Sequence, residues 1–499
     1  MKATNTLLIV LFLTTAIVQF GKAQNWIQKG LDIDGETPYE ESGFSVSLSS
    51  DGNTVAFGAP SNDDCGIDAG QVLIYSWNGS AWVQKGADIY GEAAGDYAGW
   101  SVSLNSDGNT VAFGAPYNDG NEFASGHVKV FYWDGGAWVQ KGLNIDGEAI
   151  DDASGRSISL SSDGNTIAIG APFNDGNGIT SGQTRIYGWN GTVWIQKGTD
   201  IDGEAGADQS GYSVSLSSDG NTIAIGAPDN DNNGSLSGNV RIYSWNGNSW
   251  EQKGSDINGE MSNDFSGYSV DLNSDGTFVA IGAPWNDGSW NNAGHVRIYR
   301  WNSHVWVQQG IDIDGEAPDD HFGYSVSLNS EGNTVAIGAP SHDGNEPDEG
   351  HTRVYSWNGS FWSQMGLDID GEAAKDESGV SVSLNSDGMS VAIGAHNNSD
   401  NGINSGQTRV YEYDVNIFVN ETAIPNIVLF PNPNNGKFSV MNLNNCTQIK
   451  IYNTLGKIVY QAETIENNIK IDLLKFKKGT YRLYGISNQH VQVLEFIIE

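Results

Sequence analysis

A tryptophan recurs every 56 residues along most of this chain, and no insertion or deletion interrupts the spacing over seven copies. A fixed period of this length indicates one supersecondary unit that cannot bury its own apolar face and must pack on copies of itself. The repeat therefore restricts the fold to a stacked or ring-shaped array of identical units. The recurring tryptophans are Trp26, Trp82, Trp138, Trp194, Trp250, Trp306 and Trp362.

Each repeat contains four segments with β-strand patterns, as the copy at 211–257 shows. Segment 211–216 alternates side chains and runs into Ser-Asp-Gly-Asn, a tight-turn sequence. Segment 222–227 is short, β-branched and apolar, as in a central strand. Segment 239–245 alternates again and leads through Asn-Gly, a strong hairpin signal, into a fourth strand at 250–257. No window shows helical periodicity.

Four antiparallel strands repeated seven times predict an all-β fold, a seven-bladed β-propeller. The repeats also predict how the ring closes. A first copy of the fourth strand, at 26–33, precedes the first blade, whereas the last blade, at 379–413, lacks a clear one. We expect the N-terminal strand to complete the last blade. A rival closure uses Phe418, which lies 56 residues after the last recurring tryptophan.

The ends of the chain indicate export. Lys2, an apolar run at 7–18 and Gly21-Lys22-Ala23 read as a secretory signal peptide at 1–23. We expect no transmembrane segment, because that run is shorter than the roughly 20 residues that span a bilayer. With only two cysteines, the exported protein depends on its core and not on a disulfide framework.

Charge is shared unevenly along the chain. Residues 24–424 hold 14 basic and 56 acidic side chains, whereas residues 425–499 hold eight basic and five acidic ones. The acidic part would repel nucleic acid and anionic lipid, so we expect no nucleic-acid partner. Its field suits cations, basic partners or solubility outside the cell.

Gly-Ala-Pro occurs six times, first at 58–60, and becomes Gly394-Ala395-His396 in the seventh repeat. A Phe-Gly pair is present at Phe322-Gly323. This text resembles the FG-GAP repeat of integrin α-subunit propellers, and we expect the propeller to span 24–418. That family often places a nine-residue calcium loop between its first two strands. The link here is only Ser-Asp-Gly-Asn, so those calcium sites are not carried over.

After residue 418 the repeats stop and three prolines, Pro425, Pro431 and Pro433, follow. We interpret 419–426 as a linker. The segments at 429–438, 449–457 and 478–483 resemble the type A C-terminal sorting domain of the type IX secretion system, covering 427–499. Alternating short strands predict a small β-sandwich. The resemblance implies the type IX machinery as a partner and a final location in the medium or at the outer-membrane surface.

The longer loops of each repeat are expected on one face of the ring. These are the second-to-third links and the interblade links, and binding residues gather on such loops over a rigid scaffold. The link after Gly-Ala-Pro varies from blade to blade. Exposed aromatics there stack on sugars or dock peptides, although scattered surface aromatics are also normal. The candidate ligand-binding residues are Tyr117, Phe173, Trp285 and Trp290.

The interblade loop repeats acids at relative positions 1, 3, 5 and 9. Calcium favours clusters of hard oxygen ligands, so Ca²⁺ is a candidate cofactor, although no cofactor is certain. Isoleucine at position 2 and glycine at position 4 favour the alternative, a solvated turn at a strand end. The candidate ligands are Asp32, Asp34, Glu36, Glu40; Asp200, Asp202, Glu204, Asp208; Asp312, Asp314, Glu316, Asp320; Asp368, Asp370, Glu372 and Asp376.

The sequence offers little support for catalysis. His127, His295 and His351 share one repeated slot and read as polar strand starts, and no His/Cys cluster has metal spacing. The strict period leaves no inserted loop for an active site. We therefore expect a monomeric, non-enzymatic, adhesin-like propeller that binds a glycan or a protein. The alternatives are a glycan-degrading enzyme, with a carboxylate pair among the many acids, or a structural surface-layer protein.

Overall fold

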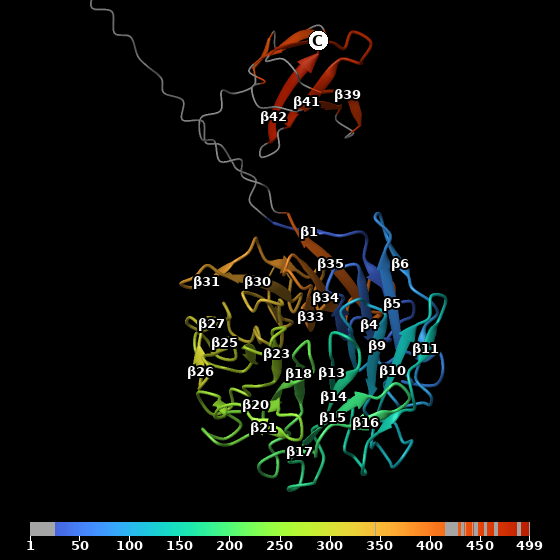
Figure 1. The fold of residues 1–499 in the computed structure, drawn as a ribbon, viewed down its shortest axis with the longest axis vertical. Helices are drawn as coiled ribbons and strands as arrows, with labels where there is room; N and C mark the ends of the chain where they lie inside the picture. Colours follow the sequence, from blue (N-terminus) through green and yellow to red (C-terminus); the bar gives the residue numbers. More distant parts are fainter. Residues whose placement is uncertain are drawn as a thin grey trace, which may run out of the picture. The chain divides into compact units, whose positions relative to one another are not determined.

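The repeats form seven antiparallel sheets arranged as the blades of a ring (Figure 1). The computed structural model describes residues 25–344, 346–414, 428–430, 434, 436–441, 443, 448–453, 457–463, 468–486 and 491–498. The predicted signal peptide at 1–23, the predicted linker at 419–426 and Phe418 lie outside the described residues. The chain divides into two units, Met1–Asp414 and Val415–Glu499. We describe each by itself.

Every blade has the same strand order. The first strands, several of them labelled near the centre of Figure 1, are β3 (Ser45–Leu48), β8 (Ser101–Leu104), β13 (Ser157–Leu160), β18 (Ser213–Leu216), β23 (Ser269–Leu272), β28 (Ser325–Leu328) and β33 (Ser381–Leu384). The second strands are β4 (Thr54–Ala59), β9 (Thr110–Ala115), β14 (Thr166–Ala171), β19 (Thr222–Ala227), β24 (Phe278–Ala283), β29 (Thr334–Ala339) and β34 (Ser390–Ala395). The third strands are β5 (Gln71–Trp77), β10 (His127–Trp133), β15 (Gln183–Trp189), β20 (Asn239–Trp245), β25 (His295–Trp301), β30 (His351–Trp357) and β35 (Gln407–Tyr413).

Two short strands follow on the outer edge of each blade. The first of each pair begins at the recurring tryptophan: β1 (Trp26–Gln28), β6 (Trp82–Gln84), β11 (Trp138–Gln140), β16 (Trp194–Gln196), β21 (Trp250–Gln252), β26 (Trp306–Gln308) and β31 (Trp362–Gln364). The second of each pair is β2 (Ile33–Asp34), β7 (Ile89–Tyr90), β12 (Ile145–Asp146), β17 (Ile201–Asp202), β22 (Ile257–Asn258), β27 (Ile313–Asp314) and β32 (Ile369–Asp370). Blades 1 to 6 are β3–β7, β8–β12, β13–β17, β18–β22, β23–β27 and β28–β32, and blade 7 is β33–β35 with β1 and β2.

The fourth strand differs from the continuous strand that the sequence predicts. Both of its pieces pair with the third strand, and four residues, the second of them glycine, separate the two pieces. In blade 1 these residues begin with Lys85-Gly86, where Gly86 has a φ of 84°. A Cβ on Gly86 would lie 2.7 Å from the Trp133 ring and 2.8 Å from the Trp138 ring of the next blade. The neighbouring tryptophans therefore occupy the space that a side chain would need, and the strand breaks around a glycine.

Apolar packing between blades follows from the strand patterns. The second strands are almost fully buried, and Val111 and Phe113 of β9 have no exposed surface. They pack with residues of the preceding blade, including Val72 and Ile74 of β5, in one apolar cluster. Because each core is shared by two neighbours, no blade buries its apolar surface alone.

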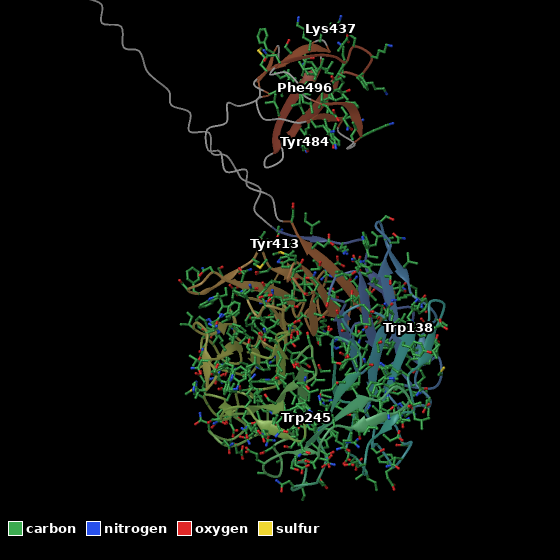
Figure 2. The ribbon with its side chains drawn as sticks, in the orientation of Figure 1. Trp138, Trp245, Tyr413, Lys437, Tyr484 and Phe496 are labelled. Atoms are coloured by element: carbon green, nitrogen blue, oxygen red, sulfur yellow. The ribbon has the colours of Figure 1, made fainter. Side chains whose placement is uncertain are left out.

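Hydrogen bonds at the repeat spacing also join the blades. The Trp82 indole N–H donates to the Lys29 carbonyl oxygen at 2.6 Å, and the Leu104 N–H donates to Ser47 Oγ at 2.9 Å. The Lys29 ammonium lies 5.5 Å from the centre of the Trp77 ring, which pairs with Trp82 across the hairpin turn as predicted. Trp138 and Trp245, labelled in Figure 2, belong to the equivalent sets of other blades.

The ring closes through its N-terminal strand, as predicted. β1 pairs with β35 in the register Trp26 to Tyr413, and β2 pairs with the same strand. The Trp26 indole donates to the Met365 carbonyl oxygen at 2.8 Å, which repeats the contact made by Trp82 in blade 1. Trp26 is 6% exposed, so the first strand is anchored by burial as well as by pairing.

The described residues of the C-terminal unit form two sheets. One has the order β36-β37-β40 and the other β39-β38-β41-β42. Phe438 of the first sheet and Phe496 of the second belong to one apolar core, and their ring centres lie 4.7 Å apart. Phe496 is labelled in Figure 2. This is the predicted two-sheet arrangement. Its strands are β36 (Val428–Phe430), β37 (Lys437–Met441), β38 (Gln448–Asn453), β39 (Ile458–Glu463), β40 (Ile469–Asp472), β41 (Gly479–Ile486) and β42 (Val491–Ile498).

Candidate functional site

One face of the ring, here called the loop face, carries the second-to-third links and the interblade links. The two kinds of loop are bonded to each other through their backbones. Tyr97 N donates to Asp68 O at 3.0 Å, and Ala98 N donates to Ala69 O at 3.0 Å. Tyr97 is held at a φ of 54°, in the left-handed region that non-glycine residues rarely adopt. Equivalent residues of other blades share this conformation, so all blades hold the loop face in the same backbone geometry.

The position-9 acids of the interblade loops are buried inside their own loops. Glu40 is 1% exposed, and its carboxylate accepts hydrogen bonds from Thr37 N at 3.1 Å and from Asn62 Nδ2 at 3.1 Å. Asp208 accepts from Ala205 N and from Asn230 Nδ2, each at 3.0 Å. Asp320 and Asp376 accept equivalent backbone bonds from Ala317 and Ala373. These carboxylates hold the turn together.

The acids at positions 1, 3 and 5 of the interblade loop each have different surroundings. Position 1 accepts from a glutamine four residues earlier, as in Gln28 to Asp32 at 2.6 Å, and the same contact is made to Asp200, Asp312 and Asp368. Position 3 lies at the end of the short outer strand: Asp34, Asp202, Asp314 and Asp370. Position 5 pairs with an arginine of the next blade: Glu204 with Arg241, Glu316 with Arg353 and Glu372 with Arg409, whereas Glu36 faces a blade with Leu73 in that place.

The four acids of one loop are therefore divided among separate hydrogen-bonding tasks. Their carboxylates face the preceding glutamine, the neighbouring blade and their own turn. Calcium binding by the four together stays a prediction, with this division of partners counting against it.

Within the described residues, a different grouping brings possible metal ligands together. Glu260, His295 and Asp312 each have a ligand atom within 4.8 Å of the others, as do His351, Asp368 and Asp370. The histidines are the ones that the sequence suggests are plain strand starts. Burial lowers the pKa of His295 to about 4, with nearby Arg297 acting in the same direction and Asp312 opposing it. The His295 imidazole is neutral at neutral pH.

An aromatic pocket of about 560 Å³ lies on the loop face at blades 2 and 3. It brings together two of the four predicted ligand-binding residues, Tyr117 and Phe173, although they belong to different repeats. Tyr97 packs edge-on against Tyr117 with ring centres 5.4 Å apart, and Phe123 is 66% exposed. The lining residues are Ala94, Gly95, Tyr97, Tyr117, Asp119, Phe123, Ala124, Asp151, Ala153 and Phe173.

Trp285 and Trp290 lie away from that pocket. Trp285 packs between Phe265 and Tyr268, at 5.0 Å from each ring centre, in blade 5. Trp290 is 57% exposed on the same second-to-third link. The structure thus divides the four predicted aromatics into one pair that shares a pocket and two residues at blade 5.

Sequence reasoning missed Tyr97, although a signal was present. The residue 20 positions before each variable site after Gly-Ala-Pro also varies, and the two touch in several blades. Tyr97 meets Tyr117, Phe265 meets Trp285, and in blade 6 His321 Nδ1 lies 3.0 Å from Ser341 Oγ. Pairwise variation at this fixed spacing marks the variable surface of the loop face.

A chain of aromatic side chains surrounds the ring centre where the first strands begin. Phe44 and Trp100 have ring centres 4.7 Å apart, and the Arg156 guanidinium lies 5.1 Å from the Trp100 ring and donates to the Tyr212 hydroxyl at 2.8 Å. Tyr212, Tyr268 and Tyr324 continue the chain at 4.9 Å spacings. Burial raises the pKa of Tyr268 well above its ordinary value, so its hydroxyl stays protonated.

A polar cavity of about 350 Å³ lies among the first strands. Five blades contribute a serine to it at one position, and blade 5 contributes Asp271 instead. Burial raises the pKa of Asp271 to about 6, while hydrogen bonds from Leu328 N and Ser215 Oγ oppose the shift. No helix among the described residues has the length and apolar character to cross a membrane.

Comparison with known families finds matches in both units. FG-GAP repeats match residues 195–243 and 308–355, and a secretion system C-terminal sorting domain matches residues 428–499. No curated protein matches the sequence. Among solved structures, a "putative 6-phosphogluconolactonase from Bacteroides uniformis" shares 13% identity, and the match covers 66% of this chain and 86% of that chain with a TM-score of 0.46.

Proposed function

We propose that this protein binds a carbohydrate in the loop-face pocket of blades 2 and 3. The protein is an FG-GAP repeat propeller, and its sorting domain directs it through type IX secretion to the cell surface or the medium. One observation carries the proposal. Tyr97, Tyr117, Phe123 and Phe173, from three loops, converge on one pocket together with two carboxylates.

The pocket has the chemistry that sugars need. Aromatic faces present broad apolar surface against which the C–H face of a pyranose packs. Asp119 and Asp151 offer carboxylate oxygens that accept hydrogen bonds from hydroxyl groups. A volume of about 560 Å³ falls in the usual range of small-ligand sites. Because residues 24–424 carry 56 acids against 14 basic residues, a neutral or cationic sugar suits the site better than an anionic one.

The pocket is also held in shape without ligand. Asp151 N donates to Phe123 O at 2.9 Å, and Ala153 N donates to Ala124 O at 3.2 Å. Asp119 Oδ1 accepts from Ala124 N at 2.8 Å, which fixes the loop that carries Phe123. A preformed site loses little conformational entropy on binding, and this favours affinity from a small contact area.

Screening the purified full chain on a glycan array, followed by calorimetry on the best ligand, tests the proposal. We expect Phe173→Ala and Phe123→Ala to weaken binding at least about tenfold, which corresponds to roughly 1.4 kcal/mol. Trp290→Ala removes an exposed aromatic outside the pocket and is the matched control, with affinity unchanged. Equal losses in all three variants, or none in the pocket variants, would contradict the proposal.

The same samples address the other functions. Glycoside hydrolysis requires two suitably placed carboxylates, and Asp119 and Asp151 both line the pocket. Release of reducing sugar that is lost in Asp119→Asn would therefore make the pocket an active site. Binding of surface protein but of no glycan would favour a protein ligand. Ordered self-assembly without either activity would favour a structural surface-layer role.

A further inference from the structure

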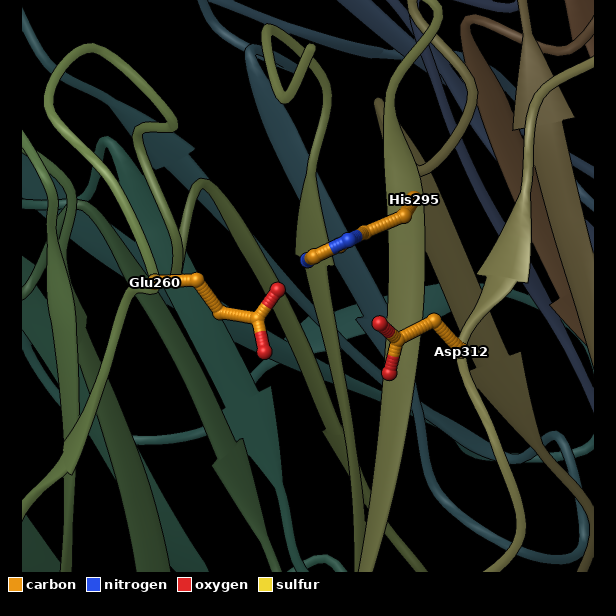
Figure 3. Close-up of side chains that lie close together, drawn as sticks. All are labelled: Glu260, His295 and Asp312. Carbon is orange, nitrogen blue, oxygen red and sulfur yellow. The ribbon is translucent and has the colours of Figure 1, made fainter. Parts of the chain in front are cut away.

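The carboxylates of Glu260 and Asp312 and the imidazole of His295 point toward one another in blade 5 (Figure 3). Glu260 follows β22, His295 begins β25 and Asp312 precedes β27, so three separate segments bring them together. Their nearest ligand atoms all lie within 4.8 Å of one another. His295 is 1% exposed, and its Nε2 has no hydrogen-bond partner. A buried polar atom without a partner is costly, so this arrangement calls for an occupant.

Two sister blades show how a glutamine pairs in the slot that His295 occupies in blade 5. In blade 3 the slot holds Gln183, whose Nε2 donates to Glu148 Oε2 at 3.4 Å and to Asp202 Oδ1 at 3.5 Å. In blade 7 Gln407 donates in the same way to Glu372 and Asp34. In those blades the amide thus serves the position-5 glutamate and the position-3 aspartate, whose counterparts in blade 5 are Glu260 and Asp314. In blade 5 the imidazole of His295 lies instead with Glu260 and the position-1 acid Asp312.

We propose that Glu260, His295 and Asp312 bind a divalent transition-metal ion, with zinc as the reference ion. Zinc takes imidazole nitrogen and carboxylate oxygen at about 2.0–2.2 Å, which places ligands of a tetrahedron roughly 3.4 Å apart. The present spacing closes to that value by small side-chain movements, because Glu260 is 45% exposed. Three protein ligands leave a fourth position for water.

The opposing charge near the site is Arg297. Its Nη1 lies 3.5 Å from Glu260 Oε1, and its Nη2 donates to Asn258 O at 2.8 Å. This arginine neutralises one of the two carboxylates only in part, since the contact is long and involves a single oxygen. A net negative charge remains for the cation.

The other two histidine slots are weaker candidates. In blade 2 Lys129 Nζ contacts Glu92 Oε1 at 2.6 Å, and Asn144 replaces the position-1 acid. In blade 6 Arg353 binds Asp368 through Nε at 3.0 Å and Nη2 at 2.9 Å. Blade 2 therefore lacks the position-1 acid, and in blade 6 the position-1 acid is already paired with a cation. Blade 5 alone among the three keeps the position-1 acid without a bound cation.

The test uses the purified full chain after removal of metals with a chelator. Zinc alone is titrated by calorimetry, and cobalt alone by visible absorption, which reports its coordination. We expect one zinc site that weakens at least about tenfold in His295→Gln and in Asp312→Asn. Both variants place in blade 5 an amide of the kind that sister blades carry, so the fold is retained. His304→Gln, at an exposed hairpin turn, is the matched control with unchanged binding.

Each outcome decides the proposal. Loss of one zinc equivalent in His295→Gln with retention in His351→Gln and His304→Gln supports it. The proposal is overturned if the wild type binds no zinc, if His295→Gln binds zinc as the wild type does, or if binding depends on His351 and not on His295. Calcium is titrated in parallel: calcium binding that persists in His295→Gln, without zinc binding, belongs to the carboxylate loops and also overturns the site.

Discussion

At the scale of single residues, one position of the first strand shows how a lone substitution changes the chemistry of the ring centre. In six blades a serine hydroxyl accepts a hydrogen bond from the leucine N–H of the next blade, as from Leu104 to Ser47 at 2.9 Å. In blade 5 Asp271 accepts the equivalent bond from Leu328 at 2.7 Å. The geometry is preserved, but a titratable group enters the cavity.

Asp271 should make the stability of the propeller depend on pH. Its pKa is about 6 in the folded chain against an ordinary 3.8, so the folded state holds the proton more tightly than the unfolded state. Relative to Asp271→Ser, the wild type should lose about 1–3 kcal/mol of stability as pH rises from about 4 to about 6. Urea unfolding at several pH values measures this. All 16 tryptophans precede residue 363, so their fluorescence reports the propeller alone.

The variant places in blade 5 the serine that the other blades carry, which keeps the leucine hydrogen bond. A difference between the two proteins that stays constant across this pH range would show that Asp271 titrates normally.

At the scale of elements, the outer strand pair performs the same task in every blade and closes the ring in the last. Trp82 of β6 donates its indole N–H to the carbonyl oxygen of Lys29 in the preceding blade. Trp26 of β1 donates in the same way to the carbonyl oxygen of Met365. The seventh blade thus takes its edge from the start of the chain, and no ladder edge of β35 is left open.

Loss of Trp26 should open the ring. Trp26 is 6% exposed and packs on Tyr413 with ring centres 5.1 Å apart. We expect Trp26→Ala to cost about 3–5 kcal/mol, since burial and the indole hydrogen bond are both lost. Ile27→Ala in the same strand is the control, because Ile27 is 53% exposed, and should cost less than about 1 kcal/mol. Similar melting temperatures for Trp26→Ala and the control would refute closure by this strand.

At the scale of the whole molecule, the two units differ in composition and in role. The acidic repeats carry the loops, the pocket and the proposed metal site, whereas residues 425–499 hold eight basic and five acidic residues and match the sorting domain. Each unit has its own apolar core among the described residues.

Removal of residues 427–499 should therefore change location without changing the propeller. We expect the truncated protein to accumulate in the periplasm of the native host, with the tryptophan-reported unfolding of the full chain. Cell fractionation and fluorescence measure the two properties. Arrival of the truncated protein at the surface would separate export from the tail, and a destabilised propeller would show that the units fold as one.

The strand order, the number of blades, the N-terminal closure and the sorting domain could all be predicted from the sequence. Each depends on the alternation of apolar and polar residues, on turn residues or on the repeat spacing, and all of these can be read directly along the chain. The break in the fourth strand could not, because Gly86 is required by Trp133 and Trp138 of another blade.

Only the tertiary structure decided which side chains meet. Phe173 joins Tyr117 from the preceding repeat, and Glu260, His295 and Asp312 come from three segments of two repeats. Repeats place equivalent residues at equivalent points, so a pattern such as the position 1, 3, 5 and 9 acids suggests a cluster. The directions of the position-5 and position-9 carboxylates depend on partners in the next blade, such as Arg241 for Glu204 and Asn230 for Asp208, and those contacts follow from how the ring packs.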